Sequence, residues 1–597
     1  MLQEVILGIS VGGWITVLTM IGLFIALVYS RIPTEVAFLG ALTVLLVLGI
    51  VTEEEGMAGF GSEPVVVHAA FAVIIAGLMQ TGVLYWLTQN VFGEARSYGK
   101  AIVKLMVPTS ILAAFLNSSN VVALFIDAVK IWSVKLNISP SKLLMPLSYA
   151  ATLGGMCTLL GNSSNLVVAG LYYGKTGDTL NLFAPLLPGA VLTIVGVLIV
   201  ILLQHFIPER KSAEISFEAT SDYTVELLVP TDNPHVLQTV EEAGLLKPKG
   251  GSLLEIVRFD REIIMPVPKD EWILGGDRLV YAGQINDLLD LKRTHGLAAA
   301  NHHVWSINDI DTKRRMRTAY VTFGSELIGQ SMEHSDFESR NNVALVAVAR
   351  QGHRVDGLPR EIKLQAGDTL LLECPPKSDT QLEDSNRRSL KFFDSHFVPQ
   401  LGKKTITSAV ILILMFLVSS FHILPLMATT MLAAGALMLL GCCRMTEVTK
   451  YIEWDVLLVI GSTVVFSVAF TKTGAADLVA NSILDLCGAN PFVILAVMCL
   501  MASLVSEFIS DVGAAAVFFP IMYQQAMVLG CDPMPFVMSL MLSVTLSFAT
   551  PIGSTTHMLV FGPGSFSFTD FARLGFVMHI VLLPLLLFLI YVLYPFY

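Results

Sequence analysis

Eight apolar runs constrain the fold of this chain more than any other feature of its sequence. They cover residues 14–30, 36–51, 64–79, 182–205, 405–421, 425–440, 456–470 and 575–595. Runs of about 18 apolar residues cross the hydrocarbon core of a bilayer as helices. Only 14% of the 597 residues are charged, whereas soluble domains carry about 25%. The sequence therefore predicts a polytopic α-helical membrane protein of the plasma or inner membrane.

A polar segment, residues 208–402, separates these runs into two groups and contains no run of spanning length. The segment has a duplicated pattern, because "GDRLVYAG" at 276–283 matches "GDTLLLEC" at 367–374. We expect membrane half 1 at 1–207, soluble α+β domains at 208–302 and 303–402, and membrane half 2 at 403–597. Each soluble domain is expected to form a strand, a helix and a small sheet, with the first helix at 235–246.

Basic residues predict how the chain is oriented across the membrane. No Lys or Arg lies between residues 32 and 95, and several follow, at Lys100, Lys104, Lys130, Lys135 and Lys142. The positive-inside rule makes this basic region cytoplasmic. Counting the expected helices from it places the insert 208–402 in the cytoplasm and both termini on the extracytoplasmic side.

The tetrapeptide Asn-Ser-Ser-Asn occurs twice in apolar surroundings, at 117–120 and at 162–165. An unpartnered amide or hydroxyl costs several kcal/mol in hydrocarbon, so such groups are tolerated where they line a cavity or bind an ion. We expect a re-entrant hairpin with its tip at 117–120 and a crossing helix broken at 161–165. Freed N–H groups at such breaks favour anions, and freed carbonyl groups favour cations.

The second half carries counterparts of these features. The segment 453–484 echoes 64–93, each with a helix, a Thr-Gly break and a further helix. A second tip is expected at 510–513, in "SDVG", and a second broken helix at 550–557, in "TPIGSTTH". The predicted orientation makes the two halves inverted repeats. Secondary transporters of this kind bind substrate near the bilayer midplane, between broken helices.

At these tips and breaks the chain resembles the divalent anion/sodium symporters, the family of sodium–dicarboxylate and sodium–sulfate cotransporters. It looks closest to the subgroup with two TrkA-C domains inserted between the membrane halves. The resemblance implies a homodimer, an elevator-type motion of the hairpin domain, and an unidentified small regulatory ligand at the TrkA-C-like domains. It also implies that tips and breaks bind Na⁺ and the oxygens of the anion.

Carried over residue by residue, the resemblance yields two sets of candidate ligands. The substrate-binding set is Asn117, Ser118, Ser119, Asn162, Ser163, Ser510, Ser554 and Thr555. The cation-binding set, for Na⁺, is Ser118, Gly161, Asn165, Ser510, Asp511, Thr550, Gly553 and His557. The chain departs from the family where the middle Asn of each tip is Ser118 or Asp511, and where His557 replaces the Asn that ends the second break.

These features predict sodium-coupled symport of a small divalent anion, with sulfate favoured because small hydroxyl tips suit a compact oxyanion. A dicarboxylate is the alternative substrate. Cation/proton antiport on the same scaffold is a rival function, since Asp511 and His557 can exchange protons for Na⁺. A membrane sensor with vestigial transport is a third. Asp511 has a structural alternative as a helix N-cap, and Glu507 is expected to hydrogen-bond between helices.

Other function classes lack their sequence signals. No GxxxxGK[ST] loop is present, and no GxGxxG follows a strand, which argues against ATP-driven pumping. No TVGYG-type filter indicates a potassium channel. The seven Cys show no metal-ligand spacing, and no basic patch indicates nucleic acid. We therefore expect a transporter and not an enzyme.

Overall fold

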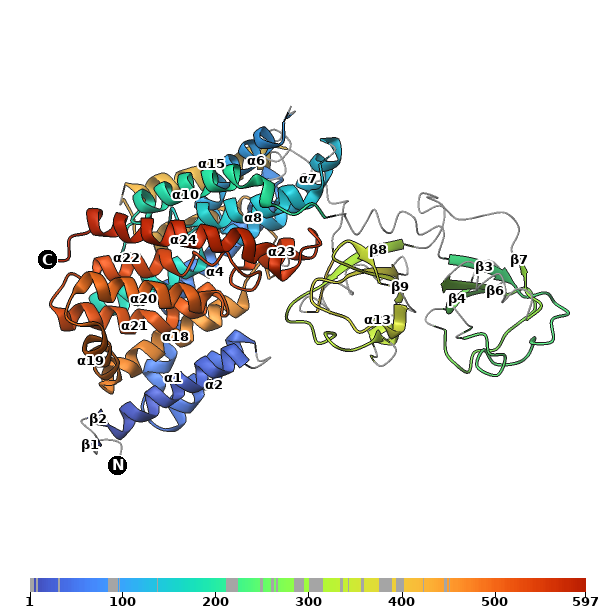
Figure 1. Cartoon of the computed structure of the whole chain (residues 1–597), viewed down its shortest axis with the longest axis horizontal. Coiled ribbons are helices and arrows are strands. Elements are labelled where there is room, and N and C mark those ends of the chain that lie inside the picture. Colours follow the sequence, from blue (N-terminus) through green and yellow to red (C-terminus); the bar gives the residue numbers. More distant parts are fainter. Residues whose placement is uncertain are drawn as a thin grey trace.

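Figure 1 shows the computed structural model, in which a body of packed helices lies beside two small sheet domains. The structure describes residues 5–6, 9–29, 33–83, 95, 97–136, 138–210, 224–246, 248, 251–258, 262–264, 267–283, 295–299, 315–332, 335, 337–341, 343–355, 359–374, 389–392, 402–421, 423–444, 448–449 and 451–597. The helix body is built from the two ends of the sequence, and the sheet domains come from its middle.

Helices from both halves of the chain form the body. The first half, after the short strands β1 (Val5–Ile6) and β2 (Ile9–Ser10), contains α1 (Val11–Tyr29), α2 (Thr34–Val47), α3 (Glu53–Phe60), α4 (Glu63–Gln80), α6 (Tyr98–Phe115), α7 (Ser118–Lys135), α8 (Pro140–Gly155), α9 (Ser163–Thr176) and α10 (Leu186–Leu202). The second contains α15 (Lys403–Ser420), α16 (Leu426–Leu439), α18 (Trp454–Lys472), α19 (Ala475–Cys487), α20 (Pro491–Ser506), α21 (Asp511–Leu529), α22 (Met534–Ser543), α23 (Thr555–Phe561) and α24 (Phe568–Leu593). The halves interlock, since α18 packs on α2, α3 and α4.

Five helical segments in the described part of the chain are long and apolar enough to span a membrane, or six if the bent pair α19 and α20 is one span. The five are 53–80, 98–115, 454–472, 511–529 and 568–593. The pair α19 and α20 is bent by 111°. Five of the eight apolar runs fall instead on shorter apolar helices, namely α1, α2, α10, α15 and α16.

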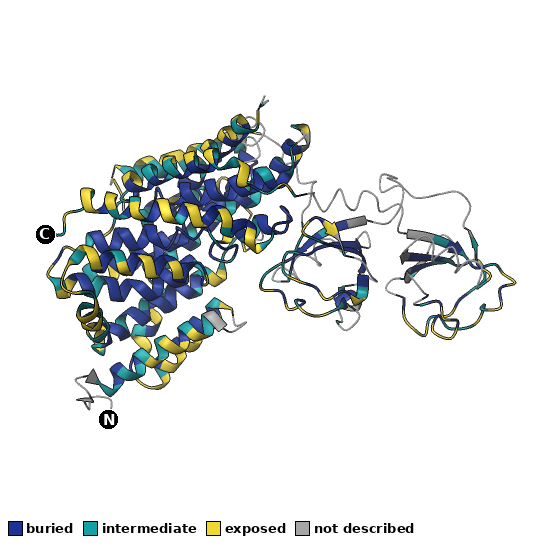
Figure 2. Cartoon of the chain, in the orientation of Figure 1, coloured by how far each residue is buried: buried dark blue, intermediate teal, exposed yellow. Residues whose placement is uncertain are grey.

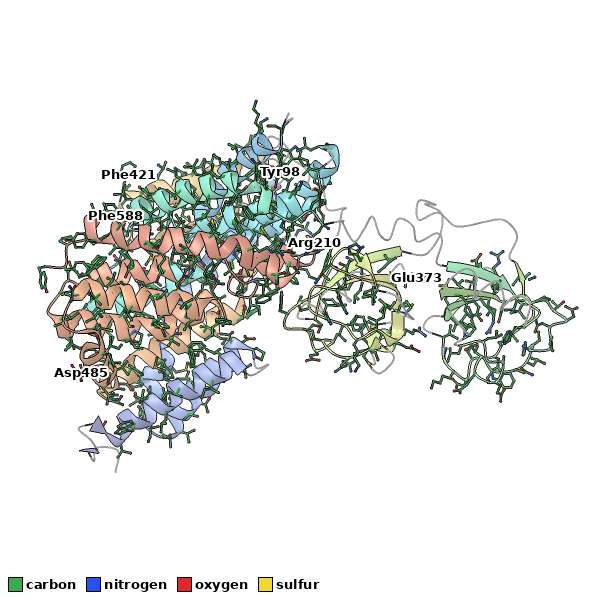
Figure 3. All side chains as sticks on the ribbon, in the orientation of Figure 1. Tyr98, Arg210, Glu373, Phe421, Asp485 and Phe588 are labelled. Carbon is green, nitrogen blue, oxygen red and sulfur yellow. The ribbon has the colours of Figure 1, made fainter. Side chains whose placement is uncertain are left out.

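Apolar side chains cover the outside of the helix body as well as its core. Buried residues run through its centre in Figure 2, whereas exposed residues mark the outer faces of several helices. Phe421 and Phe588, labelled in Figure 3, are 72% and 61% exposed at that periphery. Large apolar surfaces are rare on soluble monomers and are expected where a protein faces lipid.

The two sheet domains share one topology. The first contains β3 (Thr224–Leu228), β4 (Gly251–Arg258), β5 (Glu262–Ile264), β6 (Arg278–Gly283) and β7 (Ala298–Ala299), in the order β5-β4-β6-β3-β7. The second contains β8 (Arg315–Val321), β9 (Ala344–Arg350), β10 (His353–Arg354), β11 (Thr369–Cys374) and β12 (Leu390–Phe392), in the order β10-β9-β11-β8-β12. All pairs are antiparallel, and each sheet covers its own apolar core.

An arginine–aspartate pair occupies the same place in both sheets. Arg258 donates two hydrogen bonds of 3.1 Å to the carboxylate of Asp277. Arg350 bonds the carboxylate of Asp368 in the same way, at 2.7 and 2.8 Å. Both ladders also shift register by one residue, which marks a β-bulge at the equivalent position. The repeated "GD" sequence therefore places a buried carboxylate under an arginine in each domain.

The helix expected at 235–246 is wrong. This segment forms successive turns in the structure, and Leu237 has a positive φ of 68°. The N–H groups of Leu237 and Val240 donate to the carbonyl groups of Ile273 and Glu271, each over 2.9 Å. These tertiary hydrogen bonds hold the backbone in a non-helical geometry. They can do so because the helix propensity of a short segment is only a weak preference.

Candidate functional site

The chain leaves helical geometry between α6 and α7, where the sequence predicts the first hairpin tip. α6 ends at Phe115 and α7 begins at Ser118. The Asn117 carboxamide oxygen accepts from the Ser119 N–H over 3.0 Å, and its nitrogen donates to the Ser163 hydroxyl over 3.1 Å. Asn117 is buried, so it both turns the chain into α7 and joins the tip to the start of α9.

The first helix break covers residues 156–162, between α8 and α9. The Thr158 hydroxyl donates to the carbonyl of Ala114 and accepts from the Gly161 N–H, the latter over 3.2 Å. The Ser118 N–H donates to the Gly161 carbonyl over 3.0 Å. A Cβ at Gly161 would lie 2.6 Å from the Gly155 carbonyl oxygen, so the close backbone approach requires glycine.

The second break, residues 544–554 between α22 and α23, repeats this arrangement. The Thr550 hydroxyl donates to the carbonyl of Glu507 and accepts from the Gly553 N–H, the latter over 3.1 Å. A Cβ at Gly553 would lie 2.9 Å from the carbonyl oxygen of Ser506. Thr550 and Gly553 thus occupy the places that Thr158 and Gly161 occupy in the first break.

Glu507 distinguishes the second break from the first. Its carboxylate accepts from the N–H groups of Ala549 and Thr550, over 2.9 and 2.8 Å. The equivalent position in the first unit is Ala114, whose methyl group accepts nothing. Glu507 therefore has a hydrogen-bonding role, as the sequence predicts, because it joins the end of α20 to the backbone of the second break.

Asp511 joins the two halves of the chain. It is the first residue of α21, and Ser510 before it is the N-cap, since the Ser510 hydroxyl accepts from the Gly513 N–H over 3.2 Å. One carboxylate oxygen of Asp511 accepts from the Val512 N–H and the other from the Asn162 side-chain amide, each over 2.9 Å. The capping role thus belongs to Ser510, and Asp511 bonds the second tip to the first break.

Two buried oxygen atoms at the first break have no hydrogen-bond partner among the described residues. They are the Asn165 carboxamide oxygen and the Ser164 hydroxyl. The Asn165 nitrogen donates to the carbonyl groups of Gly155 and Thr158, over 3.2 and 2.9 Å, which orients the Asn165 oxygen away from them. Unpaired buried acceptors are uncommon and call for an explanation, such as a bound ion.

His557 is enclosed by aromatic rings at the second break. Its ring lies 5.1 Å from that of Tyr149 and 5.4 Å from that of Phe571. Its Nδ1 is hydrogen-bonded to the Ser148 hydroxyl on α8, and Thr556 contacts the same nitrogen at 3.3 Å. His557 therefore fixes α23 against α8.

Oxygen atoms are the donors that this region offers to a cation. Within the described ranges, no group of three or more His, Cys, Asp or Glu side chains is placed to hold a metal ion. The breaks instead bring together carbonyl, carboxamide and hydroxyl oxygens, the ligands that hard cations prefer. The chemistry of the donors therefore fits Na⁺ better than a transition metal.

A family model described as citrate transporter matches residues 24–462 and 410–596 of the chain. The chain belongs to the citrate transporter family. An uncharacterized transporter of Synechocystis is 28% identical over 97% of both chains. Sodium/sulfate cotransporter 1 of Chlamydomonas reinhardtii is 29% identical over 56% of this chain and 40% of its own. The sodium-dependent dicarboxylate transporter SdcS of Staphylococcus saprophyticus is 22% identical over 25% and 29%.

These similarities confirm the resemblance to sodium/sulfate and dicarboxylate cotransporters that the tips and breaks predict. The relatives are transporters and not enzymes, as expected. Together with the apolar helices, membership of this transporter family makes the chain a membrane protein.

In this member of the citrate transporter family, most of the expected site residues gather at the two breaks and tips. Asn117, Ser118, Gly161 and Ser163 form one bonded group, and Asn162 links that group to Asp511. On the other side, the Ser554 hydroxyl contacts the Thr556 hydroxyl at 2.8 Å, while Thr555 is exposed.

Sequence reasoning missed Thr158. Its hydroxyl bridges α6 and the first break, as the hydroxyl of Thr550 bridges α20 and the second. The signal was present in the sequence, because "TLLG" at 158–161 has the same Thr-x-x-Gly spacing as "TPIG" at 550–553. Only the hydrogen bonds in the structure show that this Thr-x-x-Gly spacing gives both breaks the same backbone geometry.

Proposed function

We propose that the chain is a secondary active transporter that couples Na⁺ to the symport of a small divalent anion, with sulfate as the first candidate. The observation that carries the proposal is the hydrogen bond from Asn162 to Asp511, which joins the first break to the second tip. It supports an ion-binding site to which both halves of the chain contribute. The names of the sodium/sulfate and dicarboxylate relatives support the same substrate class.

Na⁺ would bind at the oxygens that the first break leaves unpaired. The Asn165 carboxamide oxygen and the Ser164 hydroxyl are buried there without a partner among the described residues. Carbonyl groups that the break at 156–162 releases from helical hydrogen bonds would add further neutral oxygen ligands. A cation would offset the cost of burying these acceptors, which is about 1–3 kcal/mol each.

The anion would bind beside this cation, at the start of α9. Asn162 precedes α9 but directs its amide to Asp511, and its side chain makes no cap bond to α9. The N–H groups of Ser163 and Ser164 donate to no described residue and are therefore open to a ligand, whereas that of Asn165 donates to the Asn162 carbonyl over 3.2 Å. Helix N-termini attract anions through such N–H groups, and the Ser163 hydroxyl adds a further donor.

The wider architecture of the proposed transporter follows the family resemblance. We infer inverted repeats, an elevator-type motion and a homodimer, with the insert in the cytoplasm and both termini outside. The insert is proposed to contain two TrkA-C-like domains that bind a small regulatory ligand. The shared topology of the two sheets supports a duplicated insert.

Cation/proton antiport is the second candidate, and the position of Asp511 favours it. The first unit has neutral Ser118 where the second has a buried carboxylate. A membrane carboxylate is costly and is commonly retained for ion or proton exchange. Antiport would require no anion site at the start of α9.

Proteoliposomes distinguish these functions. An inward Na⁺ gradient should drive uptake of labelled sulfate, and an equal K⁺ gradient should not. Excess succinate or citrate that abolishes sulfate uptake would identify a carboxylate as the preferred substrate. A sodium-dependent pH change inside vesicles without uptake of any of these anions would replace symport by antiport.

A further inference from the structure

The second sheet domain rests on the end of α23. The ring of Phe323 lies 5.0 Å from the ring of Phe561, the last residue of α23. A Cβ built on Gly562 would lie 2.6 Å from the Tyr320 ring, so Tyr320 packs directly on the backbone there. A Cβ on Gly367 would lie 2.4 Å from the Phe561 ring. Figure 1 shows this domain between the helix body and the first sheet domain.

The same domain also contacts α7. Lys130 of α7 is buried, its Nζ donates to the Tyr320 hydroxyl over 3.1 Å, and it lies 5.3 Å from the centre of that ring. Lys391 on β12 is paired in register with Tyr320 on β8. Burial lowers the pKa of Lys391 to about 8, and the charge of Asp127 on α7 raises that pKa. Packing on the backbone at Gly562 and the hydrogen bond and cation–π contact of Lys130 therefore meet at Tyr320.

The first sheet domain lacks these features at the equivalent positions. The shared ladders align Tyr320 with Leu228, Phe323 with Thr231, and Lys391 with Ala298. Both domains have a glycine of positive φ before the buried aspartate, but a Cβ on Gly276 would meet no atom within 4 Å. The aromatic and charged surface is thus peculiar to the second copy.

The two helices that the domain contacts are those that leave the candidate site. α23 begins directly after the second break and reaches Phe561 within seven residues, a rise of about 10 Å. α7 begins at the first tip, and α23 packs against both α7 and α8. A rigid contact at the far ends of α7 and α23 therefore restrains both units of the site.

We propose that the second sheet domain is a latch. Docked on Phe561, Gly562 and Lys130, it holds α23 and α7 in the arrangement described, and its release frees the candidate site to move. The occupant of this surface is the chain's own second sheet domain, through Tyr320, Phe323 and Gly367. The effect of the latch on flux rests on the proposed transport function, whereas the restraint of α23 does not.

Hydrogen exchange in the full-length protein tests the restraint. Phe323→Ala should raise exchange in α23 at least tenfold, and Thr231→Ala, the equivalent change in the first domain, should leave it unchanged. Gly367→Ala should act like Phe323→Ala, because its methyl group meets Phe561, while Gly276→Ala carries the same backbone strain without that contact. Equal exchange in α23 for both members of each pair would overturn the latch.

A cross-link tests the consequence for transport. Phe323→Cys combined with Phe561→Cys, joined by a short reducible thiol reagent, should lower Na⁺-driven sulfate uptake at least tenfold, and reduction should restore it. Each single-cysteine variant treated with the same reagent is the control. Full uptake by the cross-linked protein would overturn the latch. If the wild-type chain takes up no anion at all, the proposed function fails and the exchange result still decides the latch.

Discussion

The side-chain amide of Asn162 donates a 2.9 Å hydrogen bond to the carboxylate of Asp511, 349 residues further along the chain. Asn162 belongs to the first helix break, and Asp511 begins the helix that follows the second tip. The pair therefore joins the two halves of the chain through one hydrogen bond. Under the proposed function, an ion that binds beside either residue would alter this contact.

Asp511→Asn should weaken the sodium dependence of uptake. The change removes the negative charge that faces Asn162, and hydrogen bonds to charged groups are worth about 1.5–3 kcal/mol. We expect the Na⁺ concentration for half-maximal sulfate uptake to change about tenfold, measured as initial rates in proteoliposomes. Asp485→Asn, on the exposed surface of α19 in Figure 3, is the control. Unchanged sodium dependence in the Asp511 variant would remove this carboxylate from coupling.

Comparing Asn165→Ala with Ser164→Ala should distinguish an effect on the stability of the fold from an effect on Na⁺ binding. Asn165 holds the break through two donated hydrogen bonds, so its loss should lower the Tm without Na⁺. The Ser164 hydroxyl donates to no described residue, so its loss should leave that Tm within about 1–2 °C. Both variants should lose the rise in Tm that Na⁺ gives the wild type. A full sodium response in both variants would place the ion elsewhere.

Glu507→Ala should destabilise the protein more than the control Glu53→Ala, a change at an exposed glutamate of α3. The change leaves the N–H groups of Ala549 and Thr550 without their acceptor, at about 1–3 kcal/mol each. Glu507→Gln retains one carbonyl oxygen and should be intermediate. Thermal unfolding in detergent measures the order, and equal Tm values for the Glu507 and Glu53 variants would contradict it.

Gly161→Ala and Gly553→Ala should each abolish uptake. The new methyl groups would lie 2.6 and 2.9 Å from carbonyl oxygens, which forces the breaks apart. Gly174→Ala on α9 is the matched control, because its methyl group meets no atom within 4 Å and alanine favours a helix. Uptake by either break variant at the level of the control would show that the close approach is dispensable.

Arg350→Leu should unfold the second sheet domain locally. Asp368 is fully buried beneath Arg350, and removing one partner of such a pair costs about 3–5 kcal/mol. Hydrogen exchange in β11 should rise while exchange in β6 of the first domain stays constant. Arg258→Leu should produce the reverse pattern, because Asp277 is its partner. A uniform rise in both sheets would mean that the domains unfold as one unit.

The membrane class and the family were predictable because their signals are local. Apolar runs and the polar tetrapeptides at 117 and 162 need no knowledge of tertiary structure, and the family match confirms the class. The helix at 235–246 failed for the opposite reason. Its periodic Val and Leu residues resemble a helix, but the N–H groups of Leu237 and Val240 bond to the strand-like segment at 271–273.

The contacts between distant residues could not be predicted. Nothing near Asn162 in the sequence points to Asp511, and nothing near Phe323 points to Phe561. The role of Glu507 was partly predictable, because a carboxylate buried near a helix break needs hydrogen-bond donors close to it. The sequence indicated its kind of role, while only the fold supplied Ala549 and Thr550 as partners.

Glu507 has a consequence for the direction in which such a transporter rests. If the two units exchange roles as the site turns from one face of the membrane to the other, the unit pinned by a carboxylate resists opening more than the unit that has Ala114 in its place. The empty protein would then favour one face over the other. The Glu507 side chain alone would then determine which side of the membrane the binding site faces in the absence of substrate.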